Sequence, residues 1–320
     1  MGLLRKEDMH ESFWKEGVSS PNLLINGDFQ IWQRGTNFSN ILKSYTADRW
    51  VVHSSSKVDV IKEGQSLKIS KPTTNTNTNI TANLWQILEK PNSLRTKTVV
   101  LSFKARSSSD LSMVCSIGVG NNFDGSTNII SNTVKLTKNG DLYSIVFDLS
   151  NHNWETDSNI CVNFRFSNFE QIWVSQVKLE IGNNATPFTP RPYGEELALC
   201  QRYYINYPVP QSLIITDATQ IGIDIHLPVS LRVNPTILLN NDCYFHTTSS
   251  QTPIKIHSAG DSLGCQPIEG NLSDWLLWFC NGGDECAVIT DGLMGVINTS
   301  NGDRNKLSGA CVIKIDAEIY

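Results

Sequence analysis

Apolar and polar residues alternate with a period of two along much of this chain. Between residues 99 and 106, Leu101, Phe103 and Ala105 share one side, while polar residues take the other. Such alternation indicates half-buried β-strands, because successive side chains of a strand point to opposite faces. Further alternating runs lie at Tyr143–Leu149, Ile160–Phe166 and Val177–Ile181. Residue pairs typical of turns lie at Asn121-Asn122, Asp124-Gly125, Asn139-Gly140 and Gly182-Asn183. Many short strands joined by turns predict an all-β protein that begins with a jelly-roll β-sandwich.

The pattern changes near residue 190. Three prolines, Pro187, Pro190 and Pro192, stiffen the exit from the predicted sandwich. A short helix is predicted at Glu195–Tyr204, because apolar residues fall on one face and two glutamates stand at its start. Alternation returns after residue 211 and predicts a second, smaller β domain. The expected parts are an N-terminal segment 1–20, a jelly roll 21–192 and a C-terminal β domain 193–320.

The N-terminal segment carries a loose apolar stripe within residues 3–16. Leu3, Leu4, Phe13 and Trp14 are its bulky members. The segment is too short to fold alone, so one hypothesis is an anchor that becomes ordered against a partner. The alternative is a frayed terminus.

Composition and charge narrow the function classes. Hydrophobic residues make up 40% and charged residues 18% of the 320 residues, and the formal net charge is -5. Nucleic-acid binding needs clustered Lys and Arg, and no such cluster occurs, so we expect no nucleic-acid partner. No apolar run reaches transmembrane length, and we expect no membrane insertion. Of the eight cysteines, Cys115 and Cys161 are expected to be buried free thiols, while the disulfide state of the other six stays open.

Catalytic chemistry finds little support in the sequence. None of the motifs G-x-S-x-G, H-E-x-x-H, G-x-G-x-x-G or the Walker loop appears. Two close carboxylates could hydrolyse glycosides, and Glu195 with Glu196 is the obvious pair. Because adjacent side chains diverge on a helix, this pair does not form such a site. We therefore expect a protein that is not an enzyme and requires no cofactor.

Several segments occur in an order that resembles a known family. The sandwich opens with NLLINGDFQIWQRG and YTADRW, and it closes with VKLEIGNNATPFTPRPY. These segments, and the later ones that continue the resemblance, are Asn22–Gly35, Tyr45–Trp50, Val177–Tyr193, Glu195–Tyr204, Leu227–Pro235 and Ala317-Glu318-Ile319. Together they resemble the carbohydrate-binding-module-like jelly roll and C-terminal domain of bacteriophage tail fibres and related virion appendages. The resemblance covers nearly the whole chain after the N-terminal segment.

The resemblance implies a virion protein that binds a host surface polysaccharide during attachment. It also implies a homotrimer whose contacts come from the C-terminal domain, where Trp275–Phe279 is densely apolar. Other virion proteins would hold the N-terminal segment. An alternative is a purely structural virion protein, such as a capsid decoration, head fibre or tail adaptor. A weaker third hypothesis is an accessory module of a bacterial glycan-processing enzyme.

Sugar binding needs an exposed aromatic ring flanked by amides and acids. Trp154 best fits this need, because it lies in a polar, loop-like run with Asn151, Asn153 and Glu155. Trp85 is the next candidate. Two other tryptophans, Trp32 and Trp50, lie in the segments that carry the resemblance and are expected in the core.

The resemblance also implies a structural calcium near the first turn and the last strand of the jelly roll. The oxygen donors here would be Asp28 and Glu180, together with backbone carbonyls. The chain departs from the family pattern at Gln30, where an acidic residue is common.

Overall fold

The structure is a computed structural model, and it describes residues 20–88, 94–119, 128–152, 159–208, 213–217, 220–239, 243–247, 254–257, 264–268, 271–281, 294–298 and 312–318. For residues 128–129, 208, 213–217, 220–224, 239, 312 and the described strands between 239 and 312, it describes the backbone alone. By their contacts the residues form two units, 1–196 with 319–320, and 197–318. The apolar stripe within residues 3–16 lies outside the described residues.

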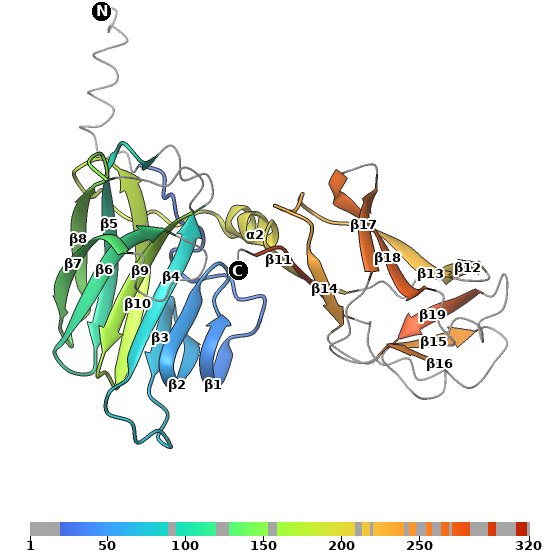
Figure 1. The fold of residues 1–320 in the computed structure, drawn as a ribbon, viewed down its shortest axis with the longest axis horizontal. Coiled ribbons are helices and arrows are strands. Elements are labelled where there is room, and N and C mark those ends of the chain that lie inside the picture. The colour runs from blue at the N-terminus through green and yellow to red at the C-terminus, as the bar shows by residue number, and fades with distance from the viewer. Residues whose placement is uncertain are drawn as a thin grey trace, which may run out of the picture. The chain divides into compact units, whose positions relative to one another are not determined.

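Ten antiparallel strands are joined by hydrogen bonds into one continuous sheet in the described part of the first unit (Figure 1). They are β1 (Asn37–Tyr45), β2 (Val51–Glu63), β3 (Ser66–Ser70), β4 (Thr81–Leu88), β5 (Thr98–Ser107), β6 (Leu111–Val119), β7 (Asn128–Leu136), β8 (Asp141–Asp148), β9 (Ile160–Ser167) and β10 (Gln171–Ile181). Nine of them follow one another in the order β7-β6-β9-β4-β2-β3-β10-β5-β8. The tenth strand, β1, pairs with β2 beside this order.

Strand β2 belongs to both layers of a sandwich. Its residues 51–54 pair with β4, and its residues 59–63 pair with β3. The front layer is therefore β7-β6-β9-β4-β2 with β1, and the back layer is β3-β10-β5-β8. Phe103 of β5 and Phe164 of β9 lie in different layers, yet their ring centroids are 4.9 Å apart. The layers thus face each other, and the predicted jelly-roll β-sandwich is confirmed.

The core between the layers follows the predicted alternation. Apolar residues of β5 point inward and are buried, whereas Lys104 on the other side of the strand is exposed. Trp32 and Trp50 belong to the core cluster, as predicted. Cys115 and Cys161 are buried free thiols, also as predicted, and burial raises the pKa of both.

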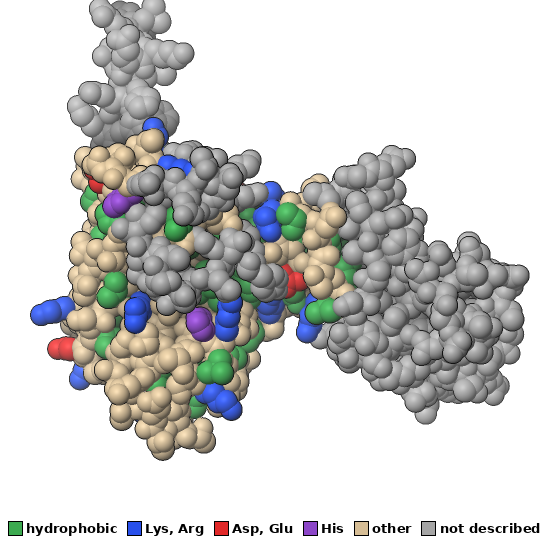
Figure 2. Space-filling model, viewed as in Figure 1, with side chains coloured by type: hydrophobic (Ala, Val, Ile, Leu, Met, Phe, Trp, Pro, Cys, Tyr) green, Lys and Arg blue, Asp and Glu red, His purple; other side chains and the backbone are tan. Residues whose placement is uncertain are grey.

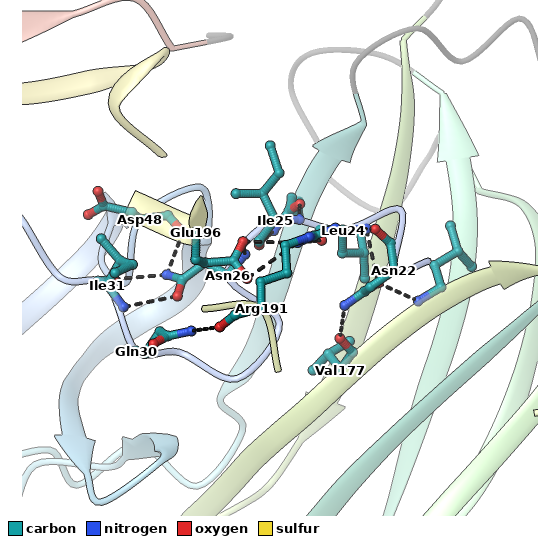
Figure 3. Close-up of polar contacts among 12 residues, drawn as sticks. Asn22, Leu24, Ile25, Asn26, Gln30, Ile31, Asp48, Val177, Arg191 and Glu196 are labelled. Carbon is teal, nitrogen blue, oxygen red and sulfur yellow. Dashed lines mark hydrogen bonds and ion pairs between the residues drawn. The ribbon is translucent and has the colours of Figure 1, made fainter. Parts of the chain in front are cut away.

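The first turn of the chain owes its shape to Asn26. Its side-chain amide donates to the carbonyls of Ile31 and Asp48 at 2.8 and 3.0 Å, and its Oδ1 accepts the Ile31 N–H at 3.0 Å (Figure 3). Asn26 has a φ of 57°, a region that Asn tolerates better than most residues. The next residue, Gly27, has no room for a side chain, because a Cβ there would lie 2.1 Å from the Val177 carbonyl oxygen.

The end of the first unit is tied to this turn. The Arg191 guanidinium donates to the carbonyls of Asn22 and Leu24 and to Glu196, whose Oε1 lies 3.0 Å away (Figure 3). Glu196 Oε1 also accepts the Asn26 N–H at 2.7 Å. Burial raises the pKa of Glu196, and the bonds from Asn26 and Arg191 oppose this effect. Asn22–Gly35, Tyr45–Trp50 and Val177–Tyr193, three of the segments that carry the resemblance, therefore meet at one junction with Glu196.

The predicted helix is present, but with different bounds. Helix α2 spans Tyr193–Gln201 rather than Glu195–Tyr204. It ends early because Cys200–Tyr203 form a turn, closed by the bond from the Tyr203 N–H to the Cys200 carbonyl at 3.0 Å, and Tyr204 starts the next strand. The Tyr203 side chain is buried, and the Arg202 and Arg232 guanidinium groups lie 6.0 and 5.9 Å from its ring centroid.

The described strands of the second unit form two antiparallel sheets. The three-stranded sheet is β11 (Tyr204–Pro208), β20 (Val312–Asp316) and β14 (Thr236–Leu239). The seven-stranded sheet, in spatial order, is β16 (Ile254–His257), β15 (Cys243–Thr247), β19 (Met294–Asn298), β12 (Leu213–Asp217), β13 (Gln220–His226), β18 (Asn271–Asn281) and β17 (Gly264–Ile268). The prediction that the chain after the helix is built of β-strands is thus confirmed. The apolar run Trp275–Phe279 lies in β18, where side chains are outside the description.

Candidate functional site

The predicted sugar-binding residues are Asn151, Asn153, Trp154, Glu155 and Trp85, and the structure describes two of them, Asn151 and Trp85. Asn151 is exposed in a turn after β8. Trp154, with Asn153 and Glu155, lies outside the described residues. Trp85 lies in β4 and is only 2% exposed, so its ring is covered rather than presented to solvent.

Trp85 belongs to a row of residues across the outer face of the front layer. Directly paired residues of neighbouring strands share a face. Pairing places the following residues in this row, in order across β1, β2, β4, β9 and β6: Tyr45, Val51, Trp85, Asn163 and Ser116. All five are buried. This row lies on the outer side of the sandwich but is as buried as the core. Within it the Trp85 ring lies beside the Asn163 amide.

One amide oxygen in this row is unsatisfied. The Asn163 Nδ2 donates to the Asn83 Oδ1 at 3.4 Å. The Asn163 Oδ1 is buried and has no hydrogen-bond partner among the described residues. A buried acceptor without a donor costs free energy, so each one needs a physical explanation.

The adjacent row reaches the surface. It contains His53 of β2, Asn83 of β4 and Arg165 of β9, which are paired directly across the strands. His53 is half-buried, Asn83 is 7% exposed and Arg165 is exposed. The three side chains offer an imidazole, an amide and a guanidinium in a line. We name His53, Asn83, Arg165, Trp85 and Asn163 the front face.

The surface row carries two cations, the exposed Arg165 and the exposed Lys43 of β1, which pairs with His53. Figure 2 shows a visible surface of the first unit made mostly of neutral side chains and backbone, with Lys and Arg standing singly. An imidazole, an amide and a guanidinium in one row can exchange hydrogen bonds with the hydroxyl groups of a polyhydroxyl ligand.

The sequence predicted part of this face only. It indicated Trp85 as a candidate and β9 as a strand, but it did not single out Asn83, Asn163 or Arg165. The available signal was local: Asn163 and Arg165 are the polar residues that alternate with buried Val162, Phe164 and Phe166. Pairing between β4 and β9, which a single sequence does not reveal, brings the two asparagines together.

The two predicted calcium ligands have different surroundings. The Asp28 Oδ1 is buried without a partner, and burial raises the pKa of Asp28. Glu180 is 1% exposed and has its partners already: Oε1 accepts the Thr186 N–H at 2.7 Å, and Oε2 accepts the Thr186 hydroxyl at 2.6 Å. The Lys178 ammonium lies 3.2 Å from Oε2. A calcium ion at Glu180 would have to displace this ammonium.

Lys178 itself sits among oxygen atoms. Its Nζ donates to the Thr186 hydroxyl at 2.5 Å and to the Pro187 carbonyl at 3.2 Å. The side chain is 1% exposed. A cation of the chain therefore occupies the oxygen-rich place beside Glu180.

Other predicted features stand as follows. Leu3, Leu4, Phe13 and Trp14 lie outside the described residues. Glu196 is buried and paired with Arg191, whereas Glu195 is exposed, so the two carboxylates do not share a site. Among the described residues, no group of three or more His, Cys, Asp or Glu side chains is arranged to hold a metal ion. None of the described helices has the length and hydrophobicity needed to cross a membrane.

Comparison with known proteins gives similarity to solved structures alone. No protein-family model matches the chain, and no curated protein matches it. One similar structure is described as "CBM4 structure and function": it is 22% identical, with 49% of this chain and 98% of that chain covered, and the TM-score is 0.36. Another is TmCBM61 in complex with β-1,4-galactotriose, at 14% identity, 51% and 100% coverage and a TM-score of 0.33.

A virion protein is also among the similar structures. It is the enzymatically active domain of tailspike protein 4 of bacteriophage CBA120, at 14% identity and a TM-score of 0.29. The similarity covers 50% of this chain and 21% of that chain. The chain is thus similar to carbohydrate-binding modules and to part of one phage tailspike. These values are too low to transfer a ligand or a residue role to this chain.

Proposed function

We propose that the first unit binds a polysaccharide at the front face and that the chain is a non-enzymatic virion appendage protein used in host attachment. One observation carries the binding proposal. The surface row of His53, Asn83 and Arg165 lies directly beside Trp85 and the unsatisfied oxygen of Asn163. Sugar hydroxyls both donate and accept, so a ligand on the surface row can pair with the Asn83 amide and the exposed Arg165 guanidinium.

The magnitude of such binding is modest for each contact. A hydrogen bond lost to a buried, unsatisfied partner costs about 1–3 kcal/mol, which is roughly a 5- to 150-fold loss of affinity. Weak single sites become useful when several copies act together, because linked copies raise the effective concentration. The homotrimer implied by the sequence resemblance would supply such copies.

Binding is tested with purified protein and a panel of neutral polysaccharides. The panel contains β-1,4-galactan, xylan and mixed-linked β-glucan, together with host envelope polysaccharide. Asn83→Ala should weaken binding of the recognised member at least fivefold, while circular dichroism stays unchanged. The matched control is Asn183→Ala, which removes an exposed asparagine in the bend after β10 of the other layer. No binding of any member, or equal binding by the Asn83 variant, contradicts the proposal.

The virion role rests on the sequence segments that resemble tail fibres and needs its own test. The proposed anchor contains Leu3, Leu4, Phe13 and Trp14, which would gain from burial against another virion protein. Deleting residues 1–20 should abolish incorporation into particles, and unchanged incorporation counts against the anchor.

A purely structural virion protein is the second candidate function. The observation that favours it is burial, since Trp85 and Asn163 are 2% and 0% exposed. In that case the buried row stabilises the sandwich, and the protein makes protein contacts alone. Glycan binding that depends on Asn83 separates the two candidates.

A further inference from the structure

A groove lies on the opposite side of the sandwich, on the outer face of the back layer. It consists of two adjoining hollows of about 420 and 240 Å³, and Lys104 of β5 lines both. Ser102, Gln176 and Phe188 line the larger hollow, and Arg106, Asn139 and Trp173 line the smaller one. The front face described above is on the other layer, so this groove is a separate site.

A bulge in β10 shapes the floor of the groove. The pairing of β10 with β5 shifts register between Ser175 and Lys178. Gln176 within this bulge has a φ of 51°, a left-handed conformation that costs a residue other than Gly free energy. Bulges re-aim side chains and are common beside functional sites. Here the bulge leaves both Ser175 and Gln176 part-exposed, and both line the groove.

Arg106 is held in place at the far end of the groove. Its guanidinium carbon lies 3.4 Å from the centre of the Trp173 ring. The Trp173 indole N–H in turn donates to Glu63 at 2.8 Å. The Arg106 side chain stays 39% exposed. An arginine stacked on an indole loses little further freedom when its outer face meets a ligand.

The charge of the groove is positive. Among the described residues no carboxylate lines either hollow, whereas Lys104 and Arg106 project from the same face of β5. Glu63 is the nearby acid, and it is shared by Lys68 at 3.1 Å and Arg106 at 3.6 Å. Lys104 is exposed and has no hydrogen bond or ion pair with the described residues. An unpaired cation in a groove attracts an anion.

The other lining groups narrow the kind of anion. Phe188 offers a half-buried ring, and Leu142, directly paired with Lys104, is 65% exposed. Gln176 and Ser102 add an amide and a hydroxyl. A sugar ring has an apolar C–H face and several hydroxyls, which match these groups. We infer that the groove binds an acidic saccharide, with the carboxylate of a uronic acid on Lys104 and Arg106 and the sugar ring between Phe188 and Leu142.

The test uses the full chain and a ligand whose charge can be removed. Trigalacturonate is titrated into the protein by calorimetry, and its methyl ester serves as the neutral ligand of the same linkage. Lys104→Gln should weaken trigalacturonate binding about fivefold, the upper range for an exposed ion pair. Lys104→Arg should restore it, and added salt should weaken it. The control variant is Lys135→Gln, which removes an exposed lysine from β7.

Each outcome decides the inference. Binding of trigalacturonate but not of its methyl ester, weakened about fivefold by Lys104→Gln and unchanged by Lys135→Gln, supports it. Absence of binding, equal binding of the methyl ester, or an equal loss with Lys135→Gln overturns it. Asn83→Ala serves as the front-face variant and should leave trigalacturonate binding unchanged. Failure of the groove can therefore be told apart from failure of the front face.

Discussion

Replacing Lys178 by Met should destabilise the first unit strongly. The Lys178 ammonium is 1% exposed and lies 3.2 Å from the equally buried Glu180 carboxylate. Met has a similar length but no charge, so the variant leaves Glu180 buried and ionised with Thr186 as its remaining partner. Removing one partner of a buried ion pair costs about 3–5 kcal/mol. For a domain of this size that corresponds to a fall in Tm of roughly 6–20 °C.

Thermal unfolding followed by circular dichroism measures the effect. Adding Glu180→Gln to Lys178→Met should recover most of the lost stability, because replacing both members of a buried pair is often close to neutral. The control is Lys71→Met, whose partner Glu170 is 67% exposed and lies 3.3 Å away. That variant should cost about 1 kcal/mol or less. A cost below about 1 kcal/mol for Lys178→Met would refute the reasoning.

Four further predictions concern the fold, the acids, the loop and the assembly. Gly27→Ala should cost about 1–3 kcal/mol or more in urea unfolding, because its Cβ would lie 2.1 Å from the Val177 carbonyl oxygen; an unchanged midpoint counts against this. Asp28 has a raised pKa in the folded state, so its contribution to stability is greatest below its ordinary value of 3.8 and declines as pH rises through the folded pKa. Asp28→Asn should therefore gain stability relative to the wild type between pH 4 and pH 7, and a constant difference contradicts this. Trp154→Ala, in a polar run of the sequence, should weaken attachment to host cells about 5- to 150-fold without lowering Tm, and the reverse pattern refutes a binding role. Light scattering should give three times the 35.7 kDa chain mass, and a monomer at micromolar concentration contradicts the trimer.

Calcium offers a separate check on the Asp28 and Glu180 hypothesis. Because the Lys178 ammonium lies beside Glu180, we expect added calcium and chelator to leave the wild-type Tm unchanged. A clear rise in Tm with calcium would support a structural calcium at these acids.

The alternation of residues predicted the strands well but not what covers them. In β10, apolar residues alternate with Lys178 and Glu180, a pattern that normally places the charged residues in water. Both are buried, and Thr186 and Pro187 of the segment after β10 contact the Lys178 ammonium. Such a contact depends on how the chain returns over its own sheet, which a period-two pattern does not encode.

In the candidate sites, too, residue types could be predicted from the sequence, but the surroundings of those residues could not. Trp85 could be named from its residue type, but its enclosure beside Asn163 depends on the pairing of β4 with β9. The groove around Lys104 depends on a bulge at Gln176, which the sequence of residues 171–181 does not predict. Long-range pairing and backbone irregularity, rather than composition, decide both sites.

Side-chain amide resonances test the proposed glycan binding most directly. The protein is labelled with ¹⁵N at asparagine, and Asn83→Ala and Asn163→Ala variants assign the two signals. Host envelope polysaccharide is then titrated in. If the front face binds sugar, the Asn83 and Asn163 amide signals shift with the same midpoint as the binding isotherm. Saturable binding that leaves both signals unmoved would contradict the account.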